Sequence, residues 1–152
     1  MKKINVRFEN DPSADGIEVL IRAEERDEEI EALINRIKNG YADTIGALDD
    51  DGSVAVIKAE DILSFSVNGK KTYVITADNR YTLNQSLQSL ERQLDEKRFI
   101  RISRYEIVNL SRVVRYDFTL GGTLRIELEG GIETWASRRC IPVIKKRLSG
   151  KE

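Results

Sequence analysis

The chain has 152 residues but no histidine, a single cysteine, two prolines and one tryptophan. Without histidine it cannot form a serine–histidine triad, a cysteine–histidine pair or a histidine-ligated zinc or haem site. The lone Cys140 cannot form an internal disulfide or a thiolate metal cluster. No carboxylate pair stands out as an acid–base couple. We therefore expect no catalytic residue, no metal and no cofactor, and the protein is not predicted to be an enzyme.

Long apolar runs are also missing. No stretch approaches the roughly 20 apolar residues that span a bilayer. Arg7 and Glu9 interrupt the start of the chain before the apolar core of a signal peptide could form. Apolar residues still make up 40% of the chain, which is enough to build a core. We expect a cytoplasmic protein with one domain, or one domain with a small appendage.

Charge is distributed unevenly along the chain. Residues 1–96 carry 12 basic and 20 acidic residues, whereas residues 97–152 carry 13 basic and 6 acidic residues. Such asymmetry is typical of a nucleic-acid binder with an acidic appendage. It also fits two ordinary solvated surfaces of opposite charge, and charge alone leaves both interpretations open.

The first 43 residues have the pattern of two strands and a helix. Apolar residues alternate at positions 4, 6 and 8 and again at positions 17, 19 and 21, on either side of the turn cluster Asn10-Asp11-Pro12-Ser13. Ile30, Leu33, Ile34 and Ile37 then recur at the spacing of one helical face. Acidic residues 27–29 lie in the first turn of this helix, and Asn39-Gly40 ends it. This acidic ββα extension is too small to be very stable alone, so we expect it to pack on the rest or on a second chain.

From about Thr44 the pattern is rich in antiparallel strands. Residues 63–67 and 73–76 flank the hairpin turn Asn68-Gly69, and further alternations follow at residues 100–102, 114–118, 124–128 and 132–136. Leucines 83, 87, 90 and 94 predict a helix over roughly residues 84–96. A last helix has Ser137 as its expected N-cap and Pro142 in its first turn. The fold class is therefore mainly β, with antiparallel sheets, a central helix and a C-terminal helix.

Several local motifs have ordinary explanations. Three contiguous acids before Gly52 differ from a calcium loop, which alternates its acidic ligands, so a solvated turn is expected. Trp135 in an alternating strand favours a core position over a base-stacking platform. Cys140 lies beside two arginines, yet a half-buried helical cysteine is the favoured interpretation.

The basic residues of the second half are more informative. Arg101 and Arg104 lie within residues 99–110, and Arg138 and Arg139 lie at a predicted strand-to-helix junction. The others are on the final helix (Lys145, Lys146 and Arg147) or after the hairpin turn (Lys70 and Lys71). The planar fork of arginine pairs with guanine O6 and N7, whereas lysine neutralises phosphate. By residue type alone, most of them would simply keep the surface soluble.

Residues 99–110 (FIRISRYEIVNL) resemble the central signature of LytTR DNA-binding domains. Residues 136–139 (ASRR) and 144–148 (IKKRL) resemble the C-terminal signature of that family, and residues 59–65 (AEDILSF) with the following hairpin fit its upstream part. The resemblance covers roughly residues 44–150. Several weak motifs in the right order make it more specific than any one of them.

The resemblance implies an elongated fold of packed β-sheets that binds double-stranded DNA through loops, which enter successive major grooves. By position, Arg104 and Arg138 become the expected base-reading residues, with Lys71 or Thr72 as a third contact. Arg139, Lys145 and Lys146 become expected phosphate contacts. Two positions depart from the family pattern: Ser103 stands where histidine is common, and Cys140 stands where an aromatic residue is common. Ser103 can still donate a hydrogen bond to phosphate.

The 43 residues before this region are too few for a receiver domain, so the chain resembles the stand-alone LytTR type. We expect residues 1–43 to be an extension that dimerises or docks a partner, and residues 44–152 to be the DNA-binding domain. The expected protein is a bacterial, homodimeric transcription regulator, and such members often sit beside a gene for a membrane protein that regulates them. The alternative is a protein-interaction module whose basic face binds an acidic partner.

Overall fold

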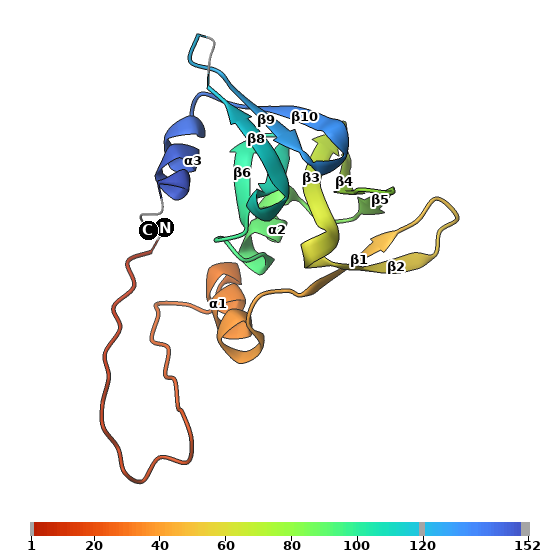
Figure 1. Ribbon diagram of the computed structural model, residues 1–152. Helices are drawn as coiled ribbons and strands as arrows, with labels where there is room; N and C mark the ends of the chain where they lie inside the picture. Colours follow the sequence, from red (N-terminus) through yellow and green to blue (C-terminus); the bar gives the residue numbers. More distant parts are fainter. Residues whose placement is uncertain (1, 119–120, 150–152) are drawn as a thin grey trace.

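The computed structural model describes residues 2–118 and 121–149 (Figure 1). Its core is a seven-stranded antiparallel sheet in the order β2-β1-β5-β4-β3-β7-β6. The strands are β1 (Thr44–Leu48), β2 (Val54–Lys58), β3 (Ile62–Asn68), β4 (Lys71–Thr76), β5 (Arg80–Leu83), β6 (Phe99–Ser103) and β7 (Glu106–Asn109). A second sheet has three strands in the order β10-β9-β8. They are β8 (Val113–Asp117), β9 (Leu124–Leu128) and β10 (Ile132–Ala136).

Three α-helices accompany the sheets: α1 (Glu28–Asn39), α2 (Leu87–Gln93) and α3 (Ile141–Leu148). None of the helices within the described residues has the length and apolar character needed to cross a bilayer. The predicted fold class is confirmed, because the chain is mainly β, with antiparallel sheets, a central helix and a C-terminal helix.

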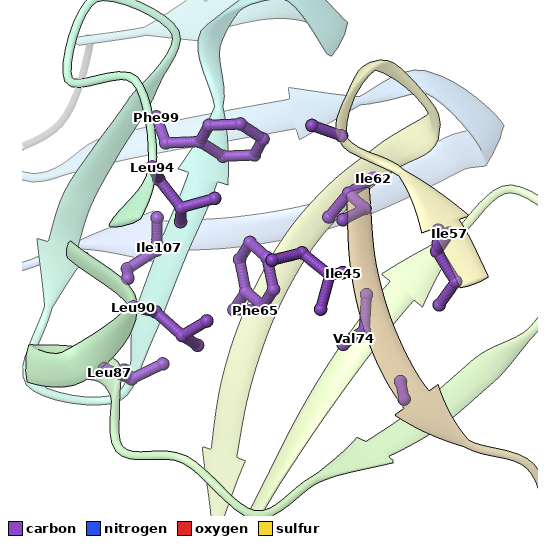
Figure 2. Close-up of a cluster of buried hydrophobic side chains, with 12 residues drawn as sticks. Ile45, Ile57, Ile62, Phe65, Val74, Leu87, Leu90, Leu94, Phe99 and Ile107 are labelled. Carbon is purple, nitrogen blue, oxygen red and sulfur yellow. The ribbon is translucent and has the colours of Figure 1, made fainter. Parts of the chain in front are cut away.

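The first core cluster lies between one face of the seven-stranded sheet and α2 (Figure 2). Leu87, Leu90 and Leu94 project from α2 and its C-terminal end onto Phe65 of β3. The Phe65 ring packs tilted against Phe99 of β6, with the ring centroids 5.8 Å apart. Such aromatic pairs add to the stabilisation that burial of the two side chains already provides.

The second core cluster lies on the opposite face of the same sheet, where the three-stranded sheet and α3 cover it. Leu124, Ile126 and Leu128 of β9 alternate inward and are fully buried. Ile144 of α3 and Ile102 of β6 complete the contact between the layers. Because β6 contributes to both clusters through Phe99 and Ile102, it fixes the two layers relative to each other.

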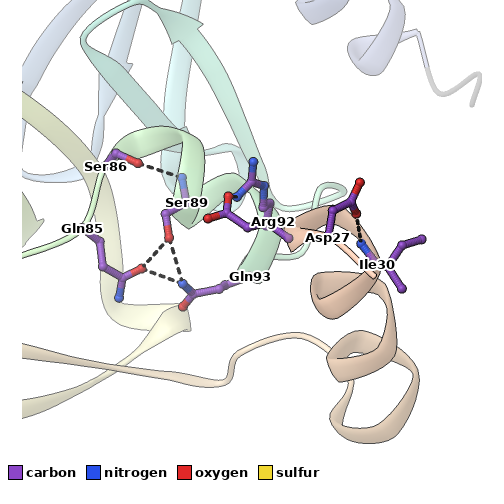
Figure 3. Close-up of polar contacts among 8 residues, drawn as sticks. Asp27, Ile30, Gln85, Ser86, Ser89, Arg92 and Gln93 are labelled. Atoms are coloured by element: carbon purple, nitrogen blue, oxygen red, sulfur yellow. Dashed lines mark hydrogen bonds and ion pairs between the residues drawn. The ribbon is translucent and has the colours of Figure 1, made fainter. Parts of the chain in front are cut away.

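The N-terminal extension matches its prediction only in its helix. Asp27 caps α1, since its Oδ1 accepts a hydrogen bond from the Ile30 N–H at 3.0 Å (Figure 3), and Gly40 ends the helix with a φ of 73°. The two strands predicted at residues 4–8 and 17–21 are wrong for this structure, since residues 2–43 contain no strand. A strand needs a hydrogen-bonded neighbour. Residues 2–26 instead form a wide loop away from the body, and Val6 is 92% exposed.

Both other helices begin later than the sequence suggests. Leu83 belongs to β5, so α2 starts only after Ser86, whose Oγ accepts a hydrogen bond from the Ser89 N–H (Figure 3). Ser137 is not the N-cap of α3, as predicted, because the helix starts at Ile141 and no side chain caps it. The Ser137 N–H donates to the Ile102 carbonyl of β6, and its buried hydroxyl has no hydrogen-bond partner within the described residues. The local sequence pattern cannot predict a hydrogen bond to a strand that is distant in the sequence.

Trp135 is also placed differently from its prediction. It is 56% exposed on β10, not in the core. Its strand does alternate, but Ala136 and Thr134 take the inward positions and Trp135 takes the outward one. Alternation tells which residues share a face, and it does not tell which face the rest of the fold covers.

Candidate nucleic-acid interface

Three connecting segments meet at one end of β6 and β7. The turn between these strands holds residues 104–105, and the Val67 N–H at the end of β3 donates to the Tyr105 carbonyl at 2.8 Å. The β3–β4 hairpin, residues 68–70, therefore lies beside the turn. On the other side, the Ser137 N–H donates to the Ile102 carbonyl at 2.8 Å, which brings in the segment between β10 and α3. We call residues 68–70, 103–105 and 137–140 the loop face.

Arg104 lies at the tip of the β6–β7 turn and is exposed. Arg101 braces this turn, because its Nε donates to the Ser103 carbonyl at 2.7 Å and its Nη2 donates to the Arg104 carbonyl at 2.9 Å. Arg101 is itself ion-paired with Glu91. Arg101 thus holds the backbone of the turn, while Arg104 at its tip is exposed to solvent.

Ser103 and Tyr105 flank Arg104. The Ser103 hydroxyl oxygen accepts a hydrogen bond from the Tyr105 N–H at 3.1 Å, so its own hydrogen can still be donated to a ligand. Tyr105 is 58% exposed and adds an aromatic ring to the loop face. Our sequence reasoning overlooked Tyr105, although its place directly after Arg104 in a turn between two alternating strands was a usable signal.

Arg138 and Arg139 are both exposed in the segment that leads from β10 into α3. A turn fixes this segment, since the Cys140 N–H donates to the Ser137 carbonyl at 3.0 Å. Cys140 is a free, half-buried thiol that packs against the second core cluster. The predicted half-burial is confirmed, but Cys140 lies in the turn before α3 and not in the helix. The segment is therefore anchored at both ends while its two arginines remain in solvent.

An open hollow of about 430 Å³ joins the β3–β4 hairpin to the β6–β7 turn. Lys70 and Arg104 both line it, and Thr72 lies at its base. Of the two alternatives for a third contact, Lys71 is exposed, whereas Thr72 is only 6% exposed and offers little surface to a ligand.

Lys145 and Lys146 are exposed on α3, which follows the loop face directly. The Lys145 ammonium lies 5.4 Å from the centroid of the Phe118 ring, a cation–π contact with the β8–β9 hairpin. This contact orients Lys145 without neutralising its charge.

Some basic residues are ion-paired and others are not, and this difference is not confined to the site: within the described residues Lys58, Arg80 and Arg115 also make no ion pair. Four arginines away from the loop tips are paired with carboxylates: Arg92 with Glu28, Arg101 with Glu91, Arg112 with Asp61 and Glu129, and Arg125 with Asp117 and Glu133. Within residues 2–118 and 121–149, the following make no ion pair: Lys71, Arg104, Arg138, Arg139, Lys145 and Lys146. The predicted site residues are thus positive charges that no acid of the described chain neutralises.

A half-buried carboxyl links the two sheets next to the loop face. The Thr134 hydroxyl of β10 donates to Oε1 of Glu106, which opens β7. Burial raises the pKa of Glu106 above its ordinary value, and the hydrogen bond from Thr134 acts in the opposite direction. This contact ties the strand after Arg104 to the strand before Arg138. Sequence reasoning missed it, although a threonine at an inward position of an alternating strand is a signal for a buried polar partner.

The described helices do not form a helix-turn-helix. Five strands separate α1 from α2, and α3 follows β10. Whatever this end of the molecule contacts must therefore meet turns and strand ends first.

Comparison with known proteins identifies the family of the chain. Residues 52–149 match the family model described as LytTr DNA-binding domain. The chain is 30% identical over 131 residues to uncharacterized HTH-type transcriptional regulators of Staphylococcus aureus strains COL and MW2, covering 85% of this chain and 87% of each relative. A solved LytTr DNA-binding domain from Bacillus cereus superposes with a TM-score of 0.67 at 23% identity, covering 70% of this chain and 97% of that one. The chain therefore belongs to the LytTR family of DNA-binding domains, as its signatures suggested.

Proposed function

We propose that this protein is a sequence-specific transcription regulator that reads the major grooves of double-stranded DNA with arginines on loops. The observation that carries the proposal is the loop face, where the β3–β4 hairpin and the segment after β10 are hydrogen-bonded to the β6–β7 unit, at Tyr105 and Ile102. The exposed basic side chains Arg104, Arg138 and Arg139 lie on these segments. The names of the Staphylococcus aureus relatives support a role in transcription.

Arg104 and Arg138 are the proposed base readers. A guanidinium can donate two parallel hydrogen bonds to O6 and N7 of one guanine. Neither side chain would have to break an ion pair with a described acid before binding, so its charge is available to DNA. Ser137 is hydrogen-bonded to Ile102, so the backbone segments that carry Arg138 and Arg104 are neighbours.

The remaining site residues are proposed to hold the duplex in place. Arg139, Lys145 and Lys146 would neutralise phosphates, and Ser103 would donate its hydroxyl hydrogen to a phosphate oxygen. Lys71 is favoured over Thr72 as the third contact, because Thr72 is nearly buried.

The proposal includes a division of the chain and a setting. Residues 44–152 would be the DNA-binding domain, since β1 and β2 belong to the same sheet as β3–β7, and residues 1–43 would be an extension. The protein would act as a homodimer in the cytoplasm of a bacterium, where its DNA is accessible, and a membrane protein encoded nearby would regulate it. The Staphylococcus aureus relatives support a bacterial origin.

Selection of bound duplexes from a random pool tests the proposal. A regulator should recover a common sequence and bind it about a thousandfold more tightly than scrambled duplex at the same salt concentration. Arg112→Gln is a matched control, because Arg112 lies at the opposite end of β7 and is already paired with Asp61 and Glu129. This variant should keep the preference, whereas Arg138→Ala should lose much of it.

A pool without any enriched sequence would contradict the proposal. If the protein enriched no duplex sequence but bound an acidic polypeptide through the same basic residues, the interaction-module alternative would replace the proposed function.

A further inference from the structure

The N-terminal extension is an incomplete fold in one copy of the chain. Its apolar side chains are strongly exposed, with Val6 at 92%, Phe8 at 86% and Ile17 at 96%. No residue of α1 is fully buried or belongs to either core cluster within the described residues, although most of its apolar side chains are half-buried. The strongly exposed apolar side chains therefore lie at the strand periodicity of residues 4–8 and 17–19, and such exposure marks a surface that a partner covers.

Polar contacts position α1 beside the body. Arg92 of α2 pairs with Glu28 at 3.1 Å, and the Arg36 guanidinium donates to the Arg92 carbonyl. The Glu28 side chain is 86% exposed, and such exposed pairs contribute little to stability. Ile30, Leu33 and Ile34 of α1 are half-buried, so the apolar stripe is partly covered in one copy.

The segment from Lys3 to Glu9 is complementary to a second copy of itself. In an antiparallel pair centred on Val6, Ile4 stands opposite Phe8 of the partner, and Lys3 stands opposite Glu9 of the partner. The symmetry repeats each of these pairs, so two opposite-charge pairs occupy one face and all the apolar residues occupy the other. Facing charges of opposite sign and facing apolar residues are what stabilise an antiparallel pair. The ion pair within one copy, between Arg7 and Glu9, is highly exposed and easily replaced.

The second segment completes a hairpin with the first. A turn already reverses the chain between them, since the Ala14 N–H donates to the Asp11 carbonyl at 3.1 Å and Ser13 bonds to the Asp11 carboxylate. Folding back along this turn places Ile17 opposite Phe8 and Val19 opposite Val6. A two-stranded hairpin is at best marginally stable in water, which explains why one copy alone does not form it.

We propose that residues 3–22 of two copies pair into one four-stranded antiparallel sheet. The interface is isologous, as a two-fold dimer requires. This interface would form the homodimer of the proposed function, and the inference rests on that function only in this respect. It does not depend on DNA binding, so it can be tested on the full chain without DNA.

Charge reversal across the pairing provides the sharpest test. The wild-type chain should sediment at twice its 17.3 kDa mass at micromolar concentration. Lys3→Glu places like charges opposite each other twice per dimer, as does Glu9→Lys, and each should raise the dimer Kd by about tenfold or more. An equimolar mixture of these two variants should dimerise again, because every facing pair is then of opposite sign. Lys58→Glu, on exposed β2, changes the net charge equally and should leave the dimer intact.

Hydrogen exchange supplies a second measurement. Amides of residues 4–8 and 17–21 should be protected in the wild-type chain and should exchange rapidly in Lys3→Glu. The dimer is expected at micromolar concentration. A wild-type chain that is still monomeric at about 100 µM, roughly a hundred times that concentration, would overturn the proposal. The proposal would also be overturned if wild type dimerised but an equimolar mixture of Lys3→Glu and Glu9→Lys stayed monomeric. DNA binding is measured separately, so a lost dimer with intact base preference would leave the proposed function standing.

Discussion

Removal of the Thr134 hydroxyl should loosen the connection between the two sheets beside the loop face. Thr134→Val keeps the shape and the strand preference of the side chain but leaves the Glu106 carboxyl without its donor. A hydrogen bond to a charged group contributes about 1.5–3 kcal/mol, and a half-buried pair belongs at the lower end of that range. We therefore expect the variant to lose about 1.5 kcal/mol of unfolding free energy near neutral pH.

The loss should depend on pH in a defined direction. Burial already raises the pKa of Glu106 above its ordinary value of 4.5, and loss of the Thr134 hydrogen bond raises it further. A carboxyl with a raised folded-state pKa contributes stability that is present at low pH and is lost as pH rises through that pKa. The variant should thus differ from wild type by well under 1.5 kcal/mol at about pH 5 and by the full amount at about pH 8.

Urea unfolding of both proteins at these two pH values checks the prediction. Glu106→Gln is the control, because a glutamine oxygen still accepts from Thr134 and carries no charge to titrate. Its stability relative to wild type should improve as the pH rises. If Thr134→Val were equally destabilising at both pH values, the carboxyl would not be responding to the loss of its partner, and the reasoning would be refuted.

Three further changes test other parts of the account. Asn109→Ala removes a fully buried side chain that donates to the Ile62 carbonyl at 2.9 Å and accepts from the Ser111 N–H at 3.0 Å, so urea unfolding should show a loss of about 2–3 kcal/mol. Leu128→Ala removes a fully buried side chain between the two sheets and should lower the unfolding free energy by about 2–5 kcal/mol in the same assay. Lys145→Ala should weaken binding to all duplexes alike and flatten the salt dependence of log K by about 0.9 in a titration at several salt concentrations. A sequence-dependent loss there would argue against a phosphate contact.

Alternation and short motifs predicted the features that depend on neighbouring residues in the sequence. The alternation at residues 124–128 places Leu124, Ile126 and Leu128 inward, and all three are fully buried. The family signatures at residues 99–110 and 136–148 identified the turns that carry Arg104 and Arg138. The structure adds that these turns are neighbours, through hydrogen bonds of Val67 and Ser137 to residues of the β6–β7 unit.

Long-range pairing accounts for what the sequence did not predict. Ser137 resembles an N-cap because it precedes a helix, yet it is bonded to Ile102 of β6, a turn over residues 138–140 follows it, and the helix begins only at Ile141. Residues 4–8 have a strand pattern without a neighbour in the same copy, so periodicity alone gave strands that one chain does not form. Trp135 alternates correctly but faces outward, because nothing in the described chain covers that side of β10.

The most direct test of base reading by the loop face compares Arg138→Ala with wild type on the selected duplex and on a scrambled duplex at one salt concentration. The account predicts a loss of about 1–3 kcal/mol on the selected duplex, with much less on the scrambled one and relaxed preference at a single base position. An equal loss on both duplexes would mean that Arg138 contacts only phosphate, and it would contradict the central claim.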